Sequence, residues 1–426
     1  MTDIVFYFQV HQPFRLRRYT WLDIGVDHDY FDDPLNQMIV ERVAERCYLP
    51  MNRVLLEAIE RTQGRFRCSF SISGTALEQF ELWAPAVLES FRALAATGAV
   101  EFLCETRQHS LAALEDPEEF RAQVADQRAL LKRLFGVAPT SFRDTELITD
   151  ESVARQVEAL GFNVLMGEGA DTLLNGRPAT TMYRPRGTQD LTLLLRSYSY
   201  SDDIAFRFSN RSWDAYPLFA PTFVDWLMRV PEDAPFVGLF MDYETFGEHQ
   251  WAETGIFDFM RALPELVLAR KRFRFATPAE AAESRSPRVE LAYPRTYSWA
   301  DAERDLSAWL GNPMQKAAQR ALYDLAAASR AAGASATPEG VALYEDWRKL
   351  STSDHVYYMA TKWASDGDVH EYFSPYDSPH DAFILFMNVI EDLANRLRGF
   401  SGSTSAPRAP SPPHGKSGPT GPSARP

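Results

Sequence analysis

Cysteine is scarce in this sequence, and long apolar runs are missing from it. The 426 residues include three cysteines, Cys47, Cys68 and Cys104, with no CxxC spacing. An odd number of widely separated cysteines excludes a disulfide framework and a thiolate metal site. No stretch approaches the ~18 apolar residues that a membrane-spanning helix needs. The N-terminus carries no secretory leader, so we expect a cytoplasmic protein.

An excess of basic residues is also lacking. The net charge of −14 argues against nucleic acid or an anionic membrane as a partner, because both attract lysine and arginine. A neutral polymer such as a polysaccharide fits this balance better, since its binding depends on stacking and hydrogen bonds. Aromatic residues make up 13% of the chain and hydrophobic residues 45%, which is enough for a large core and for stacking surfaces.

Short apolar β-rich runs alternate with amphipathic stretches over the first 290 residues. This alternation predicts a parallel sheet, and its length and repetition favour a closed or nearly closed (β/α) barrel over residues 1–290. The expected strands are 4–10, 66–72, 100–104, 141–144, 163–166, 236–241 and 273–276. The expected helical stretches are 36–62, 76–96, 117–135 and 151–160.

The C-terminal part differs in composition. Residues 291–400 contain long Ala-, Leu- and charge-rich stretches with helical periodicity, which predict an α-helical region packed on the barrel. Residues 401–426 contain seven prolines and no large apolar side chain. Such a segment cannot bury enough surface to offset its ordering entropy, so we expect a disordered tail.

Residues 241–251 combine three carboxylates, a histidine and three aromatic side chains directly after an apolar strand. Acids at the point where a buried strand ends are typical of the catalytic face of an α/β barrel. Two other expected strands also end in polar groups, His11-Gln12 and Arg143-Asp144-Thr145-Glu146. If the latter strand continues, Asp144 and Glu146 lie on the same face.

Carboxylates from two strands of one barrel can converge across its mouth. Glu146 and an acid of the 242–244 segment would then meet the requirement for glycoside hydrolysis, with ~5–5.5 Å between the carboxyl groups for retention and ~6.5–9.5 Å for inversion. The sequence does not give this distance. Two unrelated salt-bridged acids remain the alternative interpretation.

Taken together, these segments resemble glycoside hydrolase family 57, and within it the α-amylase-like branch. The matching segments are 11–13 (HQP), 100–112, 142–148 (FRDTELI), 241–249 (MDYETFGEH) and 352–359 (TSDHVYYM). Several motifs in the same order make the resemblance more specific than any one of them. It covers residues 4 to about 395.

The resemblance implies a retaining enzyme with a (β/α)7-type barrel, an incomplete TIM-like barrel, followed by a helical region that closes over the cleft. It assigns the nucleophile to Glu146 and the general acid/base to Asp242. The substrate is expected to be an intracellular α-1,4-glucan such as glycogen or maltodextrin. The residues expected to bind it are His11, Gln12, His109, Arg143, Glu244, Phe246, His249, Trp251, Asp354 and His355.

The sequence departs from the family pattern at three places where aromatic residues are common. Gln108, Thr149 and the segment around Asn175 stand there instead. If these segments border the cleft, the recognition of long glucan chains is weaker or altered. Elsewhere, Asp202-Asp203 is interpreted as a turn cap rather than as part of the cleft, and Asp366-Gly367-Asp368 lacks the twelfth-position acid of a calcium loop.

Three classes of function therefore stay open. The first is a glycoside hydrolase, with 4-α-glucanotransferase or branching activity as its transglycosylating alternative. The second is a metal-dependent deacetylase or mannosidase-like enzyme, but His11 is followed by Gln-Pro and not by the histidine spacing of a metal site, so no metal or other cofactor is expected. The third is a catalytically weak glucan-binding protein. The oligomeric state is not indicated.

Overall fold

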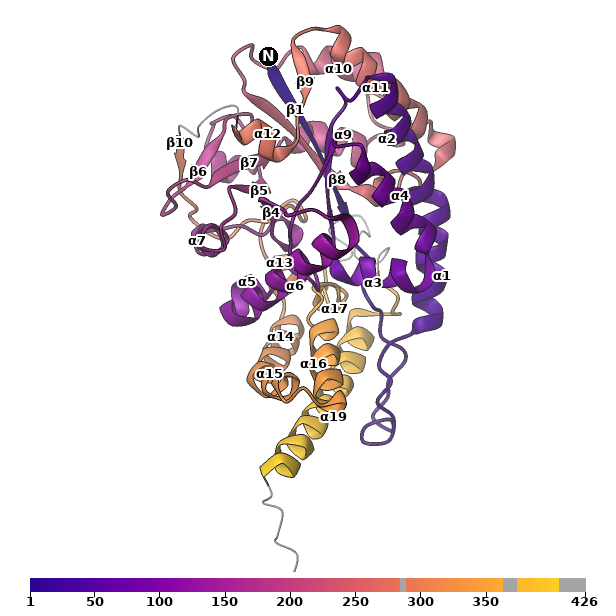
Figure 1. The fold of residues 1–426 in the computed structure, drawn as a ribbon, viewed down its shortest axis with the longest axis vertical. Coiled ribbons are helices and arrows are strands. Elements are labelled where there is room, and N and C mark those ends of the chain that lie inside the picture. Colours follow the sequence, from indigo (N-terminus) through magenta and orange to yellow (C-terminus); the bar gives the residue numbers. More distant parts are fainter. Residues whose placement is uncertain (284–288, 363–373, 406–426) are drawn as a thin grey trace, which may run out of the picture.

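The computed structural model describes residues 1–283, 289–362 and 374–405. A barrel of strands wrapped by helices forms the larger part of the molecule, and a group of helices from the C-terminal third packs beneath it (Figure 1). The expected architecture, a (β/α)7-type barrel followed by a helical region, is confirmed. The division at residues 290 and 400 remains a prediction.

Seven parallel strands form a nearly closed ring. In ring order they are β1 (Thr2–Val10), β2 (Cys68–Ile72), β3 (Val100–Phe102), β4 (Ser141–Arg143), β5 (Val164–Glu168), β7 (Thr192–Arg196) and β8 (Phe236–Asp242). A bridge between Cys104 and Phe142 joins β3 to β4, and β1 pairs with β8 over seven residue pairs. All carboxyl ends of the ring therefore meet at the same end of the barrel.

Three further strands lie outside the ring. They are β6 (Tyr183–Pro185), β9 (Phe273–Phe275), which pairs with β1, and β10 (Val289–Leu291), which pairs with β6. The sequence predicted every ring strand except β7. Both β1 and β8 are apolar without alternation because side chains on both faces are buried, one set inside the ring and the other beneath the helices.

Helices cover the outside of the ring. They are α1 (Asp33–Val43), α2 (Leu49–Arg61), α3 (Gly74–Trp83), α4 (Pro85–Ala96), α5 (Ala112–Glu115), α6 (Pro117–Phe135), α7 (Glu151–Ala159), α8 (Asp171–Leu174), α9 (Tyr198–Ala205), α10 (Ala220–Leu227), α11 (Ile256–Ala269) and α12 (Pro278–Glu283). The amphipathic stretch 36–62 is not one continuous α-helix. A π-helical turn, η1 (Ala44–Tyr48), separates α1 from α2.

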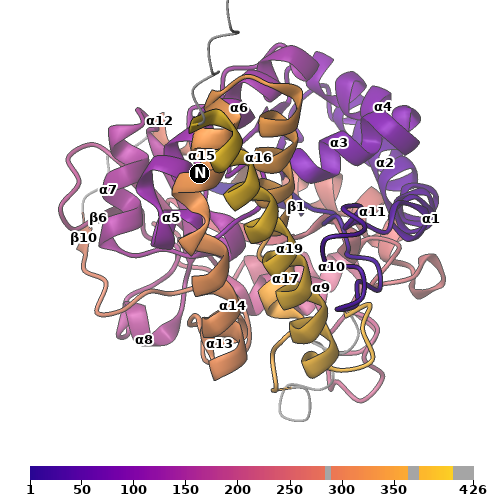
Figure 2. The ribbon, with the colours of Figure 1, turned by 90° about the horizontal axis from the view of Figure 1, so that it is seen from below.

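The helical region consists of α13 (Ser307–Leu310), α14 (Pro313–Asp324), α15 (Ala326–Ala334), α16 (Pro338–Leu350), α17 (Asp354–Tyr357) and α19 (Pro379–Ser405). Seen from below, α19 runs across α17 and beside α14 and α16 (Figure 2). The hydrophobic core of the helical region also includes Leu16, Tyr19 and Tyr30, which belong to the segment that follows β1.

The C-terminal segment expected to be disordered is partly helical. Helix α19 continues to Ser405, five residues into that segment, and residues 406–426 lie outside the described residues. Within the described ranges, no helix combines the length and apolar character needed to cross a bilayer.

Candidate active site

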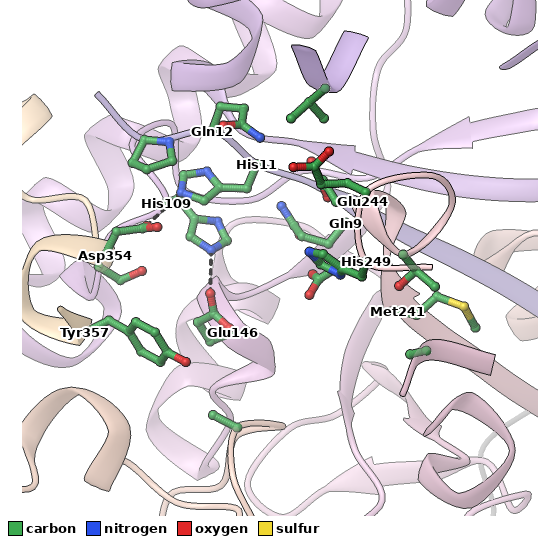
Figure 3. A pocket seen from close by; sticks show the side chains of 18 of the residues that line it. Gln9, His11, Gln12, His109, Glu146, Met241, Glu244, His249, Asp354 and Tyr357 are labelled. Carbon is green, nitrogen blue, oxygen red and sulfur yellow. Dashed lines mark hydrogen bonds and ion pairs between the residues drawn. The ribbon is translucent and has the colours of Figure 1, made fainter. Parts of the chain in front are cut away.

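A cavity of about 900 Å³ lies where the carboxyl ends of the ring strands face the helical region. Most residues predicted for the site line it: His11, Gln12, His109, Glu146, Asp242, Glu244, His249, Trp251 and Asp354. Figure 3 shows His11, Gln12, His109, Glu146, Glu244, His249 and Asp354 around the cavity. They come from the segments that follow β1, β3, β4 and β8 and from the helical region. His11 and Asp354, which are in contact in the cavity, lie 343 positions apart in the sequence.

Glu146 occupies a tight turn and not an extended strand. Strand β4 ends at Arg143, and Glu146 lies in the turn η2 (Thr145–Leu147) with φ +57°. A side chain other than glycine rarely adopts this left-handed conformation, and such residues cluster at functional sites. The expectation that Asp144 and Glu146 share one face of a continuing strand is therefore wrong. Asp144 is buried, whereas the Glu146 carboxylate faces the cavity.

Both carboxylate oxygens of Glu146 accept a hydrogen bond from a ring nitrogen. His109 Nε2 lies 3.0 Å from Oε1, and Trp299 Nε1 donates to Oε2 at 2.6 Å. Burial opposes ionisation of Glu146, but these bonds and the charges of His109 and Arg143 outweigh it and lower the pKa of the carboxyl below its usual value. Glu146 is therefore a carboxylate at neutral pH.

His109 carries the charge that stabilises Glu146. Its Nδ1 lies 2.7 Å from Glu105 Oε2, so the imidazole is placed between two carboxylates. Burial lowers its pKa, but the charge of Glu105 and the hydrogen bonds to both carboxylates prevail and raise the pKa to about 9. Glu105 itself is fully buried and lies shortly after β3.

Asp242 is in a different environment. It is the last residue of β8, and desolvation followed by the charge of Glu146 raises its pKa to about 7 against the opposing charge of Arg143. Glu244, in the turn η3 (Tyr243–Thr245), has a raised pKa as well, through burial and the charge of Asp242. The site thus lowers the pKa of Glu146 and raises that of Asp242. In glycosidases, such a difference between two carboxyls separates the nucleophile from the acid.

Three of the residues predicted to bind substrate do not line the cavity. Arg143 is fully buried, and its guanidinium lies 5.1 Å from the centre of the Trp299 ring. Its charge lowers the pKa of both Glu146 and Asp242. Phe246 is packed in the core against Phe8, and His355 is buried against Phe386 with a pKa lowered to about 4 by burial. All three side chains are buried outside the cavity, so this structure does not support their assignment to substrate binding, which stays a prediction.

The helical region completes the site. Asp354 of α17 lies 2.8 Å from His11 Nε2, and Ser73 Oγ lies 2.8 Å from the other ring nitrogen of His11. The His11 and His109 rings stack with centroids 4.0 Å apart, and Ser353 N donates to the carbonyl of His109 at 2.9 Å. The contacts of Asp354 with His11 and of His109 with Glu146 are drawn in Figure 3.

Several cavity residues were not predicted. Arg196, at the end of the unpredicted strand β7, bonds to Glu168 and Asp202, and Arg304 bonds to Asp202 at 3.3 Å. Asp202 lies inside α9 and lines the cavity, so its interpretation as a turn cap is wrong. The apolar run 191–195 before Arg196 was the signal for this strand end. Trp299 had no comparable signal, because it follows the barrel and precedes the first helix of the next region.

The positions at which the sequence departs from the family pattern lie away from the cavity. Gln108 and Thr149 are buried, and Asn175 is an exposed residue that ends α8 in the left-handed conformation. The prediction that the cleft loses aromatic surface at these places is wrong. Aromatic side chains line the cavity elsewhere, namely Phe206, Trp251, Trp299, Trp309, Tyr357 and Tyr358.

The described residues contain no group of three or more His, Cys, Asp or Glu side chains placed to hold a metal ion. The Asp366-Gly367-Asp368 segment, for which no calcium loop was predicted, lies outside the described residues.

Comparison with known proteins identifies the family. Residues 5–294 match the model of glycosyl hydrolase family 57. A curated protein of Methanocaldococcus jannaschii named "Putative alpha-amylase" is 38% identical over 403 residues, which cover 91% of this chain and 83% of the relative.

Solved structures show the same fold. A family 57 branching enzyme of Pyrococcus horikoshii superposes with a TM-score of 0.69 at 15% identity, over 95% of this chain and 92% of that one. A 4-α-glucanotransferase of Thermococcus litoralis superposes with a TM-score of 0.62 at 14% identity, over 83% of this chain and 56% of that one. The chain thus spans little more than half the length of the glucanotransferase. It belongs to glycosyl hydrolase family 57 and is a glycoside hydrolase or glycosyl-transferring enzyme.

Proposed function

We propose that the protein cleaves α-1,4-glucan with retention of configuration, with Glu146 as the nucleophile and Asp242 as the general acid/base. The observation that carries this proposal is that the site shifts the pKa values of the two carboxyls in opposite directions. Two ring nitrogens bond to Glu146 and lower its pKa, whereas desolvation raises the pKa of Asp242 to about 7.

The reaction proceeds in two displacements. Glu146 attacks the anomeric carbon while Asp242 gives its proton to the departing glycosidic oxygen, which leaves a glycosyl ester on Glu146. Asp242, now a carboxylate, takes a proton from a water molecule or from a sugar hydroxyl. The oxygen so activated displaces Glu146 from the anomeric carbon, and Asp242 regains its proton.

The choice of substrate has separate support. The chain is acidic overall, and two aromatic side chains of the cavity wall are largely exposed, Phe206 at 61% and Trp251 at 62%. Exposed aromatic rings beside an open cavity suit stacking on neutral sugar rings. The relatives named as α-amylase, branching enzyme and 4-α-glucanotransferase point to α-glucan.

Trapping of the intermediate tests the assignment. A fluorinated glucosyl or maltosyl fluoride that forms a slowly hydrolysed ester should add its glycosyl mass to the peptide that contains Glu146. The Glu146→Gln variant should remain unlabelled while still binding maltoheptaose. Labelling of a different acid, or release of the β-anomer as the first product from maltoheptaose, contradicts the proposal.

Product analysis distinguishes hydrolysis from transfer. Maltoheptaose converted only into shorter chains indicates hydrolysis, and the appearance of longer linear or branched chains indicates transglycosylation. Binding without turnover by the wild-type protein supports a glucan-binding protein. The reason for that third alternative was the loss of cleft aromatics at Gln108, Thr149 and Asn175, and these residues do not line the cavity.

A further inference from the structure

The turn formed by residues 298–305 follows the barrel and supplies part of the cavity wall. Both Trp299 and Arg304 of this turn line the cavity. Trp299 is bonded to Glu146 twice: its backbone N–H donates to the Glu146 carbonyl at 3.2 Å, and its indole donates to the carboxylate at 2.6 Å. The course of the chain directly after Trp299 therefore affects how the indole meets the carboxylate.

Arg304 closes this turn with its backbone and with its side chain. Its carbonyl accepts from Ser298 N at 3.3 Å, and its Nη1 donates to the Trp299 carbonyl. Arg304 and Asp301 both have left-handed backbone conformations, with φ +51° and +54°. Residues other than glycine keep this conformation where the surrounding contacts enforce it, and they cluster at functional sites. The two ends of the turn thus meet at Arg304.

The guanidinium of Arg304 is also anchored to the barrel. Its Nη2 donates to Asp202 of α9 at 3.3 Å, and its Nη1 lies 4.0 Å from Glu168 at the end of β5. The other carboxylate oxygen of Asp202 accepts from Arg196 at the end of β7. Both acids and Arg196 are buried, and the guanidinium lies 5.3 Å from the centre of the Tyr198 ring. A planar group with several donors can hold these partners at the same time.

We propose that Arg304 is a positioning residue of the reaction: it connects the Trp299 carbonyl to the buried acids of the barrel and thereby holds the Trp299 indole on Glu146. The inference rests on the proposed function, in which Glu146 is the nucleophile. Without the guanidinium, the turn can relax and the indole loses its fixed place. The Glu146 carboxylate is then less well oriented and less well stabilised as an anion.

The other groups around Glu146 lie outside this turn. Burial raises the pKa of Glu146, and His109, Arg143 and the hydrogen bond from Trp299 lower it. Asp242 of β8 and Tyr357 of α17 also interact electrostatically with Glu146. All of these side chains are retained when Arg304 is replaced. The change expected in Glu146 is therefore the part that Trp299 supplies.

The kinetic test compares Arg304→Met with Arg207→Met. Arg207 also pairs with an aspartate, Asp203 at 2.6 Å, and lies 5.8 Å from the centre of the Trp213 ring, but it does not line the cavity. In Arg304→Met, kcat for maltoheptaose should fall about tenfold while KM changes less than about twofold. The acidic limb of kcat should move about half a pH unit higher, because the Glu146 anion loses stabilisation. Arg207→Met should change none of these, and equal changes in both variants overturn the proposal.

A double variant shows whether Arg304 acts through Trp299. In the Trp299→Phe background the indole donor is already gone, so adding Arg304→Met should lower kcat by less than about twofold. A further tenfold fall in that background shows a direct action on substrate or on Glu146, and it overturns the proposal.

Arg304→Lys provides a result if Arg304→Met folds poorly. Lysine keeps the positive charge, but a single ammonium lacks the planar fork that spans the Trp299 carbonyl and Asp202. The kcat for maltoheptaose should therefore still fall several-fold. An unchanged kcat in Arg304→Lys shows that the charge alone is sufficient, which overturns the positioning role.

A measurement without turnover separates this inference from the proposed function. The protein contains nine tryptophans, and in protein labelled with 5-fluorotryptophan the fluorine resonance of Trp299 is assigned by its loss in Trp299→Phe. Arg304→Met should move this resonance and leave that of Trp213 in place, whereas Arg207→Met should do the opposite. An unmoved Trp299 resonance in Arg304→Met overturns the proposal even if activity falls. If no glycosidic substrate reacts with the unsubstituted protein, the proposed function fails, while the spectra still decide whether Arg304 positions Trp299.

Discussion

Trp299 donates a hydrogen bond of 2.6 Å to Glu146 across 153 positions of the sequence. The same indole lies against two buried guanidinium groups, those of Arg143 and Arg196, at 5.1 and 5.7 Å. One residue from the segment after the barrel therefore fixes the proposed nucleophile and covers the charges behind it. Its geometry links the two parts of the chain at the reaction centre.

Replacing this indole should reduce catalysis more than stability. In Trp299→Phe, Glu146 loses a hydrogen bond to its ionised form, so kcat for maltoheptaose should fall about 10- to 100-fold. Steady-state kinetics measure this effect. Trp347→Phe is the matched control, because Trp347 also loses an indole hydrogen bond, to the Leu322 carbonyl, within the core of the helical region. A similar fall of kcat in both variants would exclude a specific role for Trp299.

The protonation of Asp242 should set the alkaline limb of activity. Its pKa is raised to about 7, so kcat/KM for maltoheptaose should decline above that pH as the acid ionises. The lowered pKa of Glu146 places the acidic limb below about pH 4.5. Asp242→Asn should lose about 10²- to 10⁴-fold in rate and show no alkaline limb. A wild-type profile that stays flat to pH 9 contradicts the assignment.

His109 should make stability depend on pH in the neutral and alkaline range. Its pKa is raised to about 9 in the folded protein from ~6.5 in the unfolded chain. The stabilisation is therefore fully present below pH 6.5 and is lost as the pH rises through 9, by about 3 kcal/mol in order of magnitude. Urea unfolding at pH 6 and pH 9.5 measures this. His109→Gln should lack this part of the decline, and equal declines in both proteins would refute it.

Two aromatic residues from the same motif should behave in opposite ways. Phe246 is fully buried, so Phe246→Ala should lower the free energy of unfolding by about 3–5 kcal/mol. Trp251 is largely exposed in the cavity wall, so Trp251→Ala should leave stability unchanged and raise KM for maltoheptaose several-fold. Unfolding curves and kinetics of both variants check this pair. A stable Phe246→Ala protein with a raised KM would restore Phe246 as a binding residue.

The sequence predicted the structure correctly where the local residue pattern and the burial of the side chains agree. The apolar runs of β1 and β8 predicted buried strands, and the position of Asp242 at the end of β8 followed from them. The helical stretch 117–135 matches α6, which begins at Pro117 after Asp116 accepts from two backbone amides. Each of these features depends on only a few neighbouring residues.

The errors arose where tertiary contacts decide the outcome. Alternation along an extended strand placed Glu146 beside Asp144, but the chain turns at Glu146 with a positive φ that only the surrounding contacts enforce. Phe246 was predicted to bind substrate, but its ring is buried against Phe8 from β1, a contact between residues far apart in the sequence. The π-helical turn η1 also interrupts the predicted helix 36–62 without a local signal in the sequence.

The segment that follows β1 has a consequence for how the protein is made. Tyr30 donates to Asp392 at 2.5 Å, and His28 Nδ1 lies 2.8 Å from the same carboxylate, in a core shared with α19. During synthesis on the ribosome, Tyr30 emerges 362 positions before Asp392, its partner on α19. The core of the helical region is therefore complete only when residues 16–30 pack on it, and a nascent chain released before α19 would leave those side chains uncovered.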